Sequence, residues 1–321
     1  MSRPILSVVI VNFRTPDYVT ECLRTLLPEI EGTTVRVVVV DNQSNDGSVS
    51  AIRMWLERND KDAKVLLIEA PHNRGFASGN NIGIRAVEAD NYLLLNSDTL
   101  IRVGAIETLM NATREYPEMG LFSPRLEWPD GTGQESCFRF QTPFSEFIAA
   151  SKTRLIGHLL RRFVVAQPVQ SESFRPDWTS FACVLIRSQV FDSVGLLDEG
   201  YFMYFEDAEF CYRARNNGWN ILHDPRARVV HLRGGSSPVK KNAQQRKRLP
   251  RYFYESRTRF FFQLYGRFGL TAANLMWLIG RAVSKTRQIA GRSDKGAIKG
   301  QWRDIWINWH NPLAPYTHPG R

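Results

Sequence analysis

Acidic and imidazole side chains follow several apolar segments of this chain of 321 residues. The apolar run over residues 92–95 leads directly into Asn96, Ser97 and Asp98. In an open α/β sheet, ligands sit beyond the carboxyl ends of the strands, so an acid at such an end is aimed at a bound metal or polyol. The alternative is that Asp98 caps a helix expected over residues 103–114, and the residues alone leave both readings open.

A second group of acids, Glu206, Asp207 and Glu209, follows an aromatic segment, and a strand expected over residues 226–232 then carries His231. The aromatic residues indicate a partly desolvated pocket. Acids in the first turn of a helix are also favoured by the helix dipole without any catalytic role, and a lone histidine in a strand is more often structural. Three such groups at strand ends or helix starts can nevertheless converge at one edge of one sheet.

The elements that must position these side chains alternate between strand and helix. Strands are expected over residues 6–13, 35–42, 64–70 and 92–100, and helices over residues 18–27 and 49–59. This alternation implies right-handed crossovers and a mostly parallel sheet. The second strand is an unbroken β-branched run, as a strand covered on both faces requires, and it also ends in an acid, Asp41.

Residues 72–86 are rich in glycine and asparagine. They fit neither the dinucleotide fingerprint, whose glycines follow the first strand, nor a P-loop, which ends in Gly-Lys-Ser or Gly-Lys-Thr. A nucleotide is therefore expected to be held in another way. The segment is either a loop that lets the backbone approach a ligand or a helix N-terminus with packing glycines, and both remain open.

Four motifs in order resemble the family 2 inverting glycosyltransferases, in particular their bacterial rhamnosyltransferase-like branch. The motifs are VDNQSNDGS, NRGFASGNNIGI, NSD and FEDAEF, and the resemblance covers residues 5–235. It implies the α/β fold called GT-A, which is a Rossmann-like, mostly parallel sheet flanked by helices. We accordingly expect a catalytic domain over residues 1–238 and a basic, aromatic, helical C-terminal extension over residues 239–321.

The same resemblance implies roles for individual residues. Asp41 is expected to pair with the nucleotide base, Asp98 and His231 to ligate a metal, and Asp207 to be the catalytic base. The donor-binding residues that it implies are Asn12, Asp41, Asn73, Arg74, Asn80, Asn96 and Asp98, and those on the acceptor side are Trp178 and Glu206. One departure is that the first acid of the family's metal motif is Asn96 here, which weakens the electrostatic hold on a cation.

The implied chemistry is a single in-line displacement. An acceptor hydroxyl attacks the anomeric carbon of the sugar while a nucleoside diphosphate leaves from the opposite face. Asp207 would take the hydroxyl proton, and a well-placed base is typically worth ~10²–10⁴ in rate. Mg²⁺ or Mn²⁺ would stabilise the leaving diphosphate as a Lewis acid, and an imidazole ligand favours Mn²⁺ somewhat.

The positive charge of the chain is concentrated in its C-terminal part. The formal net charge is +10, and residues 239–299 hold 15 Lys or Arg against two acids. The stretch over residues 240–248 is expected to be flexible, and the apolar run over residues 270–283 is too short to span a bilayer. Basic and aromatic residues together indicate contact with an anionic membrane. The alternatives are helices with a solvated basic face and, since no nucleic-acid motif is present, least of all nucleic-acid binding.

The expected substrates are a nucleotide-diphosphate sugar, of which dTDP-rhamnose is the best single choice, and a glycan or polyprenyl-diphosphate-linked acceptor. Loops over residues 134–170 are expected to cover the acceptor. The start at Met1 leads directly into the first strand, and the four cysteines show neither metal spacing nor a paired framework. We therefore expect an enzyme of the cytoplasm, peripheral on the inner face of the cell membrane.

Three alternatives to this function remain. A UDP-hexose or UDP-N-acetylhexosamine transferase of the same family would share every motif. A catalytically silent module that binds sugar nucleotide or membrane would keep the fold without turnover. A nucleotidyltransferase is disfavoured, because residues 12–18 lack the glycine-rich triphosphate loop of that class.

Overall fold

The computed structural model describes residues 3–233, 238–289 and 298–319. The chain divides into two compact units: residues 1–137, 168–199 and 210–236 form the first, and residues 138–167, 200–209 and 237–321 form the second. Helix α8 (Glu206–Asn216) and the two-residue strand β7 (Cys137–Phe138) have residues in both. The domain boundary expected at residue 238 stays a prediction. Residues 234–237 and 290–297 of the predicted segments lie outside the described residues.

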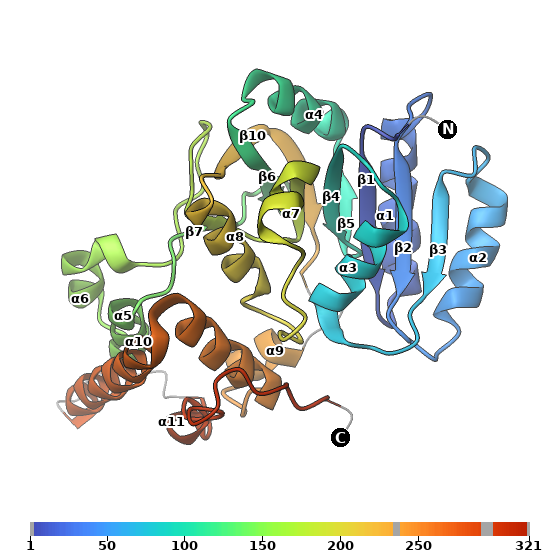
Figure 1. Ribbon diagram of the computed structural model, residues 1–321. Coiled ribbons are helices and arrows are strands. Elements are labelled where there is room, and N and C mark those ends of the chain that lie inside the picture. Colours follow the sequence, from blue (N-terminus) through green and yellow to red (C-terminus); the bar gives the residue numbers. More distant parts are fainter. Residues whose placement is uncertain (1–2, 234–237, 290–297, 320–321) are drawn as a thin grey trace. The chain divides into compact units, whose positions relative to one another are not determined.

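An eight-stranded sheet in the order β3-β2-β1-β4-β9-β6-β10-β5 forms the first unit (Figure 1). Its strands are β1 (Ser7–Asn12), β2 (Arg36–Asp41), β3 (Val65–Glu69), β4 (Asn91–Asn96), β5 (Thr99–Ile101), β6 (Met119–Glu127), β9 (Cys183–Arg187) and β10 (Asn220–His231). Strands β3, β2, β1 and β4 are parallel. Strand β9 is antiparallel to β4 and β6, and β5 is antiparallel to β10. The sheet is therefore mixed, and the strand expected over residues 92–100 is split into β4 and β5.

Helices cover both faces of the parallel part of this sheet. They are α1 (Pro16–Leu26) with the 3₁₀ turn η1 (Leu27–Ile30), α2 (Ser48–Asn59), α3 (Gly75–Ala86), α4 (Ala105–Glu115) and α7 (Ser188–Val194). Val8 and Ile10 of β1 join the core formed with α1, α2 and α4. Because side chains alternate along a strand, Val9 and Val11 point to the other face, where α3 lies.

The glycine-rich segment is the helix α3, so the expectation of a ligand-binding loop is wrong and the helical alternative is confirmed. A Cβ at Gly79 would lie 2.8 Å from Cγ1 of Val11, and one at Gly83 would overlap Cγ1 of Val9. The glycines thus let α3 approach β1 closely. This packing brings the start of α3 beside the carboxyl ends of β1 and β2.

Replacing Gly83 by Ala is expected to destabilise the first unit by about 1–3 kcal/mol, because the added methyl overlaps a rigid β-branched side chain in a closed core. The midpoint of urea unfolding measures the effect. Gly157 provides the matched control, because a Cβ there meets nothing within 4 Å. Gly157→Ala should leave the midpoint unchanged or raise it, and an equal response of both variants would contradict the packing role of Gly83.

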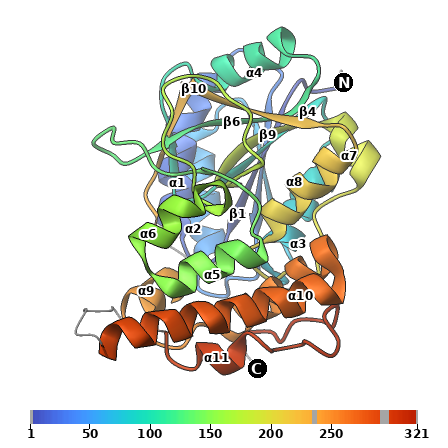
Figure 2. The ribbon, with the colours of Figure 1, turned by 90° about the vertical axis from the view of Figure 1, so that its left-hand side faces the viewer.

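The second unit is helical and has its own core. Its helices are α5 (Pro143–Ser151), α6 (Arg154–Leu159), the 3₁₀ turn η2 (Arg161–Phe163), α9 (Pro238–Gln244), α10 (Arg251–Ile289) and α11 (Gln301–Asp304). Helix α5 lies along α10 (Figure 2). The core consists of buried apolar side chains from all three segments of the unit, namely Ala150, Phe202, Val239, Leu249, Tyr252, Tyr254, Trp277 and Ile305.

Two predictions for this unit are wrong. Residues 134–170 are not only loops, since α5, α6 and η2 lie within them. Residues 240–248 are not simply flexible, because α9 extends to Gln244 and the guanidinium of Arg248 pairs with Asp304 at 2.7 Å. The local composition shows that residues 240–248 are polar. It does not show that residues distant in the sequence, such as Asp304, hold them in place.

Helix α10 is long, but it is kinked and does not have the character of a membrane-spanning helix. Gly266 interrupts it with φ 66° and ψ −171°, so α10 is two helices joined at a kink. Among the described residues, no helix combines the length and the apolar character that crossing a bilayer requires. A two-part helix of this kind is suited to packing on other helices and to lying on a surface.

The histidine at position 223 predicts a pH dependence of stability. It is buried in β10, its Nδ1 lies 3.1 Å from Oγ of Ser123, and burial lowers its pKa to about 4 despite the nearby carboxylate of Asp224. The folded state therefore binds fewer protons than the unfolded state between pH ~6.5 and ~4. Stability present above this window is expected to be lost as the pH falls through it, by up to about 3 kcal/mol.

Thermal unfolding of His223→Gln and of the exposed-residue control His72→Gln tests this effect. The acid-induced loss should shrink only in His223→Gln. An acid profile identical to that of the wild type would contradict the assignment.

Candidate functional site

Polar side chains of three neighbouring strands meet at one edge of the sheet. Asn12 ends β1, Asp41 ends β2 and Asn96 ends β4. The strand register pairs Asn12 with Asp41 and Val11 with Asn96. Since all three strands run parallel, this is the carboxyl edge, where α/β proteins bind ligands.

The carboxylate of Asp41 is buried and held by three donors. Its Oδ1 accepts from Nδ2 of Asn12 at 2.7 Å and from Oγ of Ser44 at 2.6 Å, and its Oδ2 accepts from the backbone amide of Ser44 at 2.9 Å. Asn12 is fixed in turn, because its Oδ1 accepts from the amide of Thr15. A carboxylate oxygen has two lone pairs, so Oδ2 retains the capacity to accept one N–H from a ligand.

Asn42, directly after Asp41, is a site residue that the sequence prediction missed. Its Nδ2 donates to Oδ1 of Asn73 and to the carbonyl of Gly75, both at 3.0 Å. Its Oδ1 is buried and has no hydrogen-bond partner among the described residues. A buried polar atom without a partner is costly and indicates a missing ligand or water. The sequence signal that could have identified Asn42 is its position at a strand end, directly after the predicted donor-binding residue Asp41.

The start of α3 also carries Arg74 and Asn80, which are arranged differently. The side chain of Arg74 is 59% exposed and lies 3.5 Å from Oε2 of Glu199. Burial raises the pKa of Glu199, but hydrogen bonds from Asn81 and Ser78 and the charge of Arg74 bring it below its usual value. Asn80 is buried, and its Nδ2 donates to the carbonyl of Phe76 in its own helix. Arg74 thus presents a cation to solvent, whereas Asn80 is engaged within α3.

Asp98 and His231 lie together although they are far apart in the sequence. Strand β5 is antiparallel to β10 with Thr99 opposite His231, and the amide of Leu232 donates to the carbonyl of Asp98 at 2.9 Å. Oδ1 of Asp98 lies 3.4 Å from Nε2 of His231. The capping alternative for Asp98 is wrong, because α4 begins at Ala105 behind Gly104 without a side-chain cap.

This pair provides a carboxylate oxygen and an imidazole nitrogen, both of which ligate Mn²⁺ and related divalent cations. Both side chains are largely buried, and Nδ1 of His231 has no hydrogen-bond partner among the described residues. Within the same residues, no group of three or more His, Cys, Asp or Glu could hold a metal. The pair would thus supply two of the ligand atoms that such a cation needs.

Buried polar groups support the strand that carries His231. Gln134 donates to the carbonyl of His231 at 2.7 Å. Glu127 at the end of β6 accepts from Arg102 at 2.9 Å and from Arg228 at 2.8 Å. Burial raises the pKa of Glu127, but these two guanidinium groups hold it below its usual value. The charged network ties β5, β6 and β10 together beside the pair.

Trp178 lies in β8 (Trp178–Thr179), which pairs with β7 in a separate two-stranded sheet. The residue is buried within the first unit. Thr179 next to it donates through Oγ1 to the carbonyl of Ser136 at 3.1 Å. A short turn at residues 180–182 leads from β8 into β9. The acceptor-side role of Trp178 stays a prediction.

The second acidic group belongs to the second unit. Glu206 and Asp207 open α8, as the sequence predicts, directly after Tyr204 and Phe205. These two aromatic residues have φ of 73° and 71°, a conformation that residues with a Cβ rarely adopt. The ring of Phe205 is packed against Phe253. Strained backbone of this kind is often found at functional sites.

Glu206 and Asp207 form a pair of unequal carboxyl groups. Burial and the adjacent charge of Asp207 raise the pKa of Glu206 well above its usual value. Oε2 of Glu206 is buried without a hydrogen-bond partner among the described residues. A carboxyl group whose pKa is raised beside a second carboxyl group is a combination that acid–base catalysis uses.

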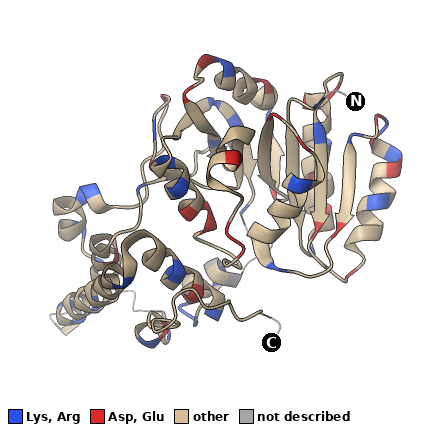
Figure 3. Ribbon diagram, viewed as in Figure 1, with Lys and Arg blue, Asp and Glu red and all other residues tan. Residues whose placement is uncertain are grey.

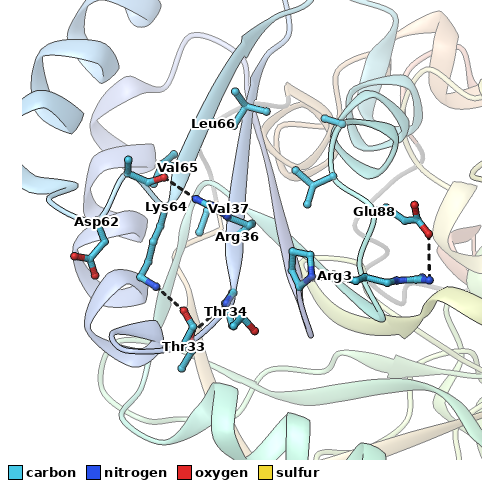
Figure 4. Close-up of a pocket in the computed structure, with 15 residues that line it drawn as sticks. Arg3, Thr33, Thr34, Arg36, Val37, Asp62, Lys64, Val65, Leu66 and Glu88 are labelled. Carbon is cyan, nitrogen blue, oxygen red and sulfur yellow. Dashed lines mark hydrogen bonds and ion pairs between the residues drawn. The ribbon is translucent and has the colours of Figure 1, made fainter. Parts of the chain in front are cut away.

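A pocket at the opposite edge of the sheet is lined by residues from the amino ends of β2 and β3 (Figure 4). Its cations already have partners. Arg3 pairs with Glu88 at 3.1 Å, and Nζ of Lys64 donates to the carbonyl of Thr33 at 2.8 Å. This pocket lies away from the strand ends that carry Asp41, so it is not the candidate site.

Residues 7–149 match the model of glycosyl transferase family 2. A relative from Haloferax volcanii, the low-salt glycan biosynthesis hexosyltransferase Agl10, is 31% identical over 223 residues, which are 67% of this chain and 63% of the relative. An N-acetylglucosaminyl-diphospho-decaprenol L-rhamnosyltransferase from Mycobacterium tuberculosis is 26% identical over 249 residues, 73% of this chain and 78% of that protein. The chain thus spans less than two thirds of the archaeal relative.

Solved structures show the same fold at low sequence identity. The mannosyltransferase PcManGT from Pyrobaculum calidifontis, in complex with GDP-Man and Mn²⁺, has a TM-score of 0.52 and 16% identity, over 98% of this chain and 86% of that one. GalNAc-T7 with UDP, GalNAc and Mn²⁺ has a TM-score of 0.59 and 15% identity, over 97% and 59%. These matches confirm the GT-A fold. Residues 7–149 thus resemble glycosyl transferase family 2, and the two sequence relatives named above are glycosyltransferases.

Proposed function

We propose that this chain transfers a sugar, with inversion, from a nucleotide-diphosphate donor to a lipid-linked glycan acceptor. The observation that carries the proposal is the Asp98–His231 pair, with 3.4 Å between Oδ1 and Nε2 beside the strand ends. L-Rhamnose from dTDP-rhamnose is the best single choice of donor, because the mycobacterial relative is named as a rhamnosyltransferase. UDP-hexose and UDP-N-acetylhexosamine donors are the alternative.

Asp41 supports recognition of the base in this proposal. Its carboxylate is fixed by Asn12 and Ser44 and keeps an acceptor position at Oδ2 for the imide N–H of thymine or uracil. The buried Oδ1 of Asn42 is a second acceptor at the same strand end. Arg74, Asn73 and Asn96 lie at the start of α3 and the end of β4, and we assign them to the donor as well.

Asp98 and His231 would hold Mg²⁺ or Mn²⁺, which supplies positive charge against the donor's diphosphate when bound. The solved structures of the same fold that contain Mn²⁺ support this assignment. The backbone of His231 is held in place by Gln134 and by the β5–β10 pairing.

Asp207 would act as the base. It takes the proton of the acceptor hydroxyl as that oxygen bonds to the anomeric carbon, and the bond from this carbon to the diphosphate breaks on the opposite face. Burial and the charge of Asp207 raise the pKa of Glu206, so this carboxyl group keeps its proton more readily than an exposed one and is suited to donate a hydrogen bond to the acceptor.

The proposed acceptor is linked to a membrane lipid, so the reaction would take place at a membrane surface. The mycobacterial relative is named for a decaprenyl-diphosphate-linked acceptor. The basic segment over residues 239–299 suits an anionic membrane surface, and we propose that the enzyme works at the inner face of the cell membrane in the synthesis of a cell-surface polysaccharide.

Calorimetric binding of dTDP-, UDP- and GDP-sugars in the presence of Mn²⁺ tests the donor site. One nucleotide class should bind, and Asp41→Asn should weaken it by about tenfold or more, because a charge-assisted hydrogen bond is lost. Asp62→Asn, at the opposite edge of the sheet, is the control and should bind as the wild type does. Binding of no nucleotide sugar, or equal binding by Asp41→Asn, would sink the donor-site proposal.

A further inference from the structure

Residues 147–171 contain no Asp or Glu and include four cations, Lys152, Arg154, Arg161 and Arg162. Helix α6 and the turn η2 lie within this stretch. In Figure 3, helix α6 carries blue Lys or Arg positions, and the stretch contains no acidic residue. A segment of one sign of charge attracts a surface of the opposite sign.

Helix α6 also exposes large apolar side chains. Leu155 is 66% exposed and Leu159 is 71% exposed. They are four residues apart and therefore lie on the same face of the helix. Phe144 at the start of α5 is a further exposed aromatic residue, at 45%. Neighbouring exposed leucines need an explanation, whereas single exposed apolar residues do not.

The segment is held in place by contacts within the second unit. The rings of Phe144 and Phe163 stack with centroids 4.6 Å apart, which fixes η2 against α5. Nη1 of Arg287 in α10 donates to the carbonyl of Lys152 at 3.1 Å and to Oγ1 of Thr153 at 2.7 Å, which fixes the start of α6. The exposed leucines are thus presented by an ordered element, so little further ordering is required on binding.

We propose that the α6–η2 face, defined by Leu155, Leu159, Arg161 and Arg162, docks on an anionic lipid bilayer. The leucines enter the boundary between head groups and acyl chains, and the cations contact lipid phosphates. The absence of acids over residues 147–171 favours a lipid surface over an apolar protein groove, because a groove would not need a uniformly basic rim. The inference goes beyond the transferase proposal and does not depend on a donor or metal.

Flotation of the full chain with vesicles tests this surface. The wild type should bind vesicles of phosphatidylcholine with phosphatidylglycerol and bind phosphatidylcholine alone much more weakly. The double variant Leu155→Glu/Leu159→Glu should bind the anionic vesicles at least about tenfold more weakly, because it loses apolar insertion and gains repulsion. Arg161→Gln/Arg162→Gln should weaken binding to the anionic vesicles alone, by about tenfold or more.

Two variants distinguish this face from other exposed apolar positions. Val103→Glu changes a side chain that is 97% exposed, and Met54→Glu changes one that is 53% exposed, both in the first unit. Both should bind as the wild type does, and thermal melting should show that every variant is folded. Unchanged binding by the leucine variant, or an equal loss of binding in Met54→Glu, overturns the inference. Binding to neither vesicle also overturns it and leaves the face to a protein partner.

Discussion

Turnover of the Asp207→Asn variant is expected to fall by about 10²–10⁴-fold, with donor affinity nearly unchanged. Asparagine keeps the shape of the side chain and loses the ability to take the acceptor's proton. Because the base acts on the acceptor hydroxyl, the donor complex should form as in the wild type. Steady-state transfer with the bound nucleotide class, together with calorimetric donor binding, measures both quantities.

Glu206→Gln is the matched variant. The pKa of Glu206 is raised by burial and by the charge of Asp207, which favours the protonated form, and glutamine imitates that form. This variant should therefore retain most of the turnover. The reverse outcome, with Glu206→Gln inactive and Asp207→Asn active, would reassign the base. Equal collapse of both variants together with loss of the fold on thermal melting would instead indicate a structural role for the start of α8.

Donor affinity of the Asp98→Ala variant is expected to fall by about 10–100-fold when Mn²⁺ is present. Removing the carboxylate takes away the charged partner of His231 in the proposed cation site. In a chelator, wild type and variant should bind the donor equally weakly, since the contribution of the cation is then absent from both. Calorimetry with and without Mn²⁺ separates these cases.

Asp90 provides a control at the other end of β4. It precedes β4 at the end opposite Asp98 and pairs with Arg3 at 3.0 Å. Asp90→Asn removes a negative charge at the amino end of β4, away from the strand ends that form the candidate site. Donor binding by this variant should therefore keep its dependence on Mn²⁺. Loss of this dependence in Asp90→Asn, or its retention in Asp98→Ala, would contradict the assignment of the cation site.

The N-terminal half of the fold was largely predictable from the sequence. β-Branched runs and helix starts place β1, β2, β3 and their helices within a residue or two, because these elements are set by local periodicity. The direction of pairing was harder to predict. Strand β9 is as apolar as its neighbours, and nothing in an apolar run of five residues distinguishes an antiparallel partner from a parallel one.

The site was predicted in part. The strand ends at Asn12 and Asp41 follow from the pattern of the strands, and the family resemblance singled out Asp98 and His231. Helix α3 was ambiguous, because glycine and asparagine are typical of loops and only the contact of Gly83 with Val9 shows why a helix needs glycine there. Asn42 was missed because its role depends on a buried oxygen without a partner, which is a property of the packed structure alone.

The second unit could not be predicted well from local sequence patterns. Its core combines Ala150, Phe202 and Trp277 from segments that are distant in the sequence. Local sequence patterns do not identify such partners, so residues 134–170 were predicted to be loops and residues 240–248 to be flexible. Composition described the surface of these segments correctly as basic and aromatic, but their order comes from contacts that only the folded chain contains.

The pairing of β5 with β10 has a consequence for the order in which the protein is made. The Asp41 cluster needs only residues from the first two strands and the turn after β2. The Asp98–His231 pair has to wait until β10 has been synthesised and has closed on β5. A chain emerging from the ribosome can therefore form the Asp41 cluster well before it can assemble the proposed cation site. A ligand bound at the proposed cation site would accordingly stabilise only chains that have completed the sheet.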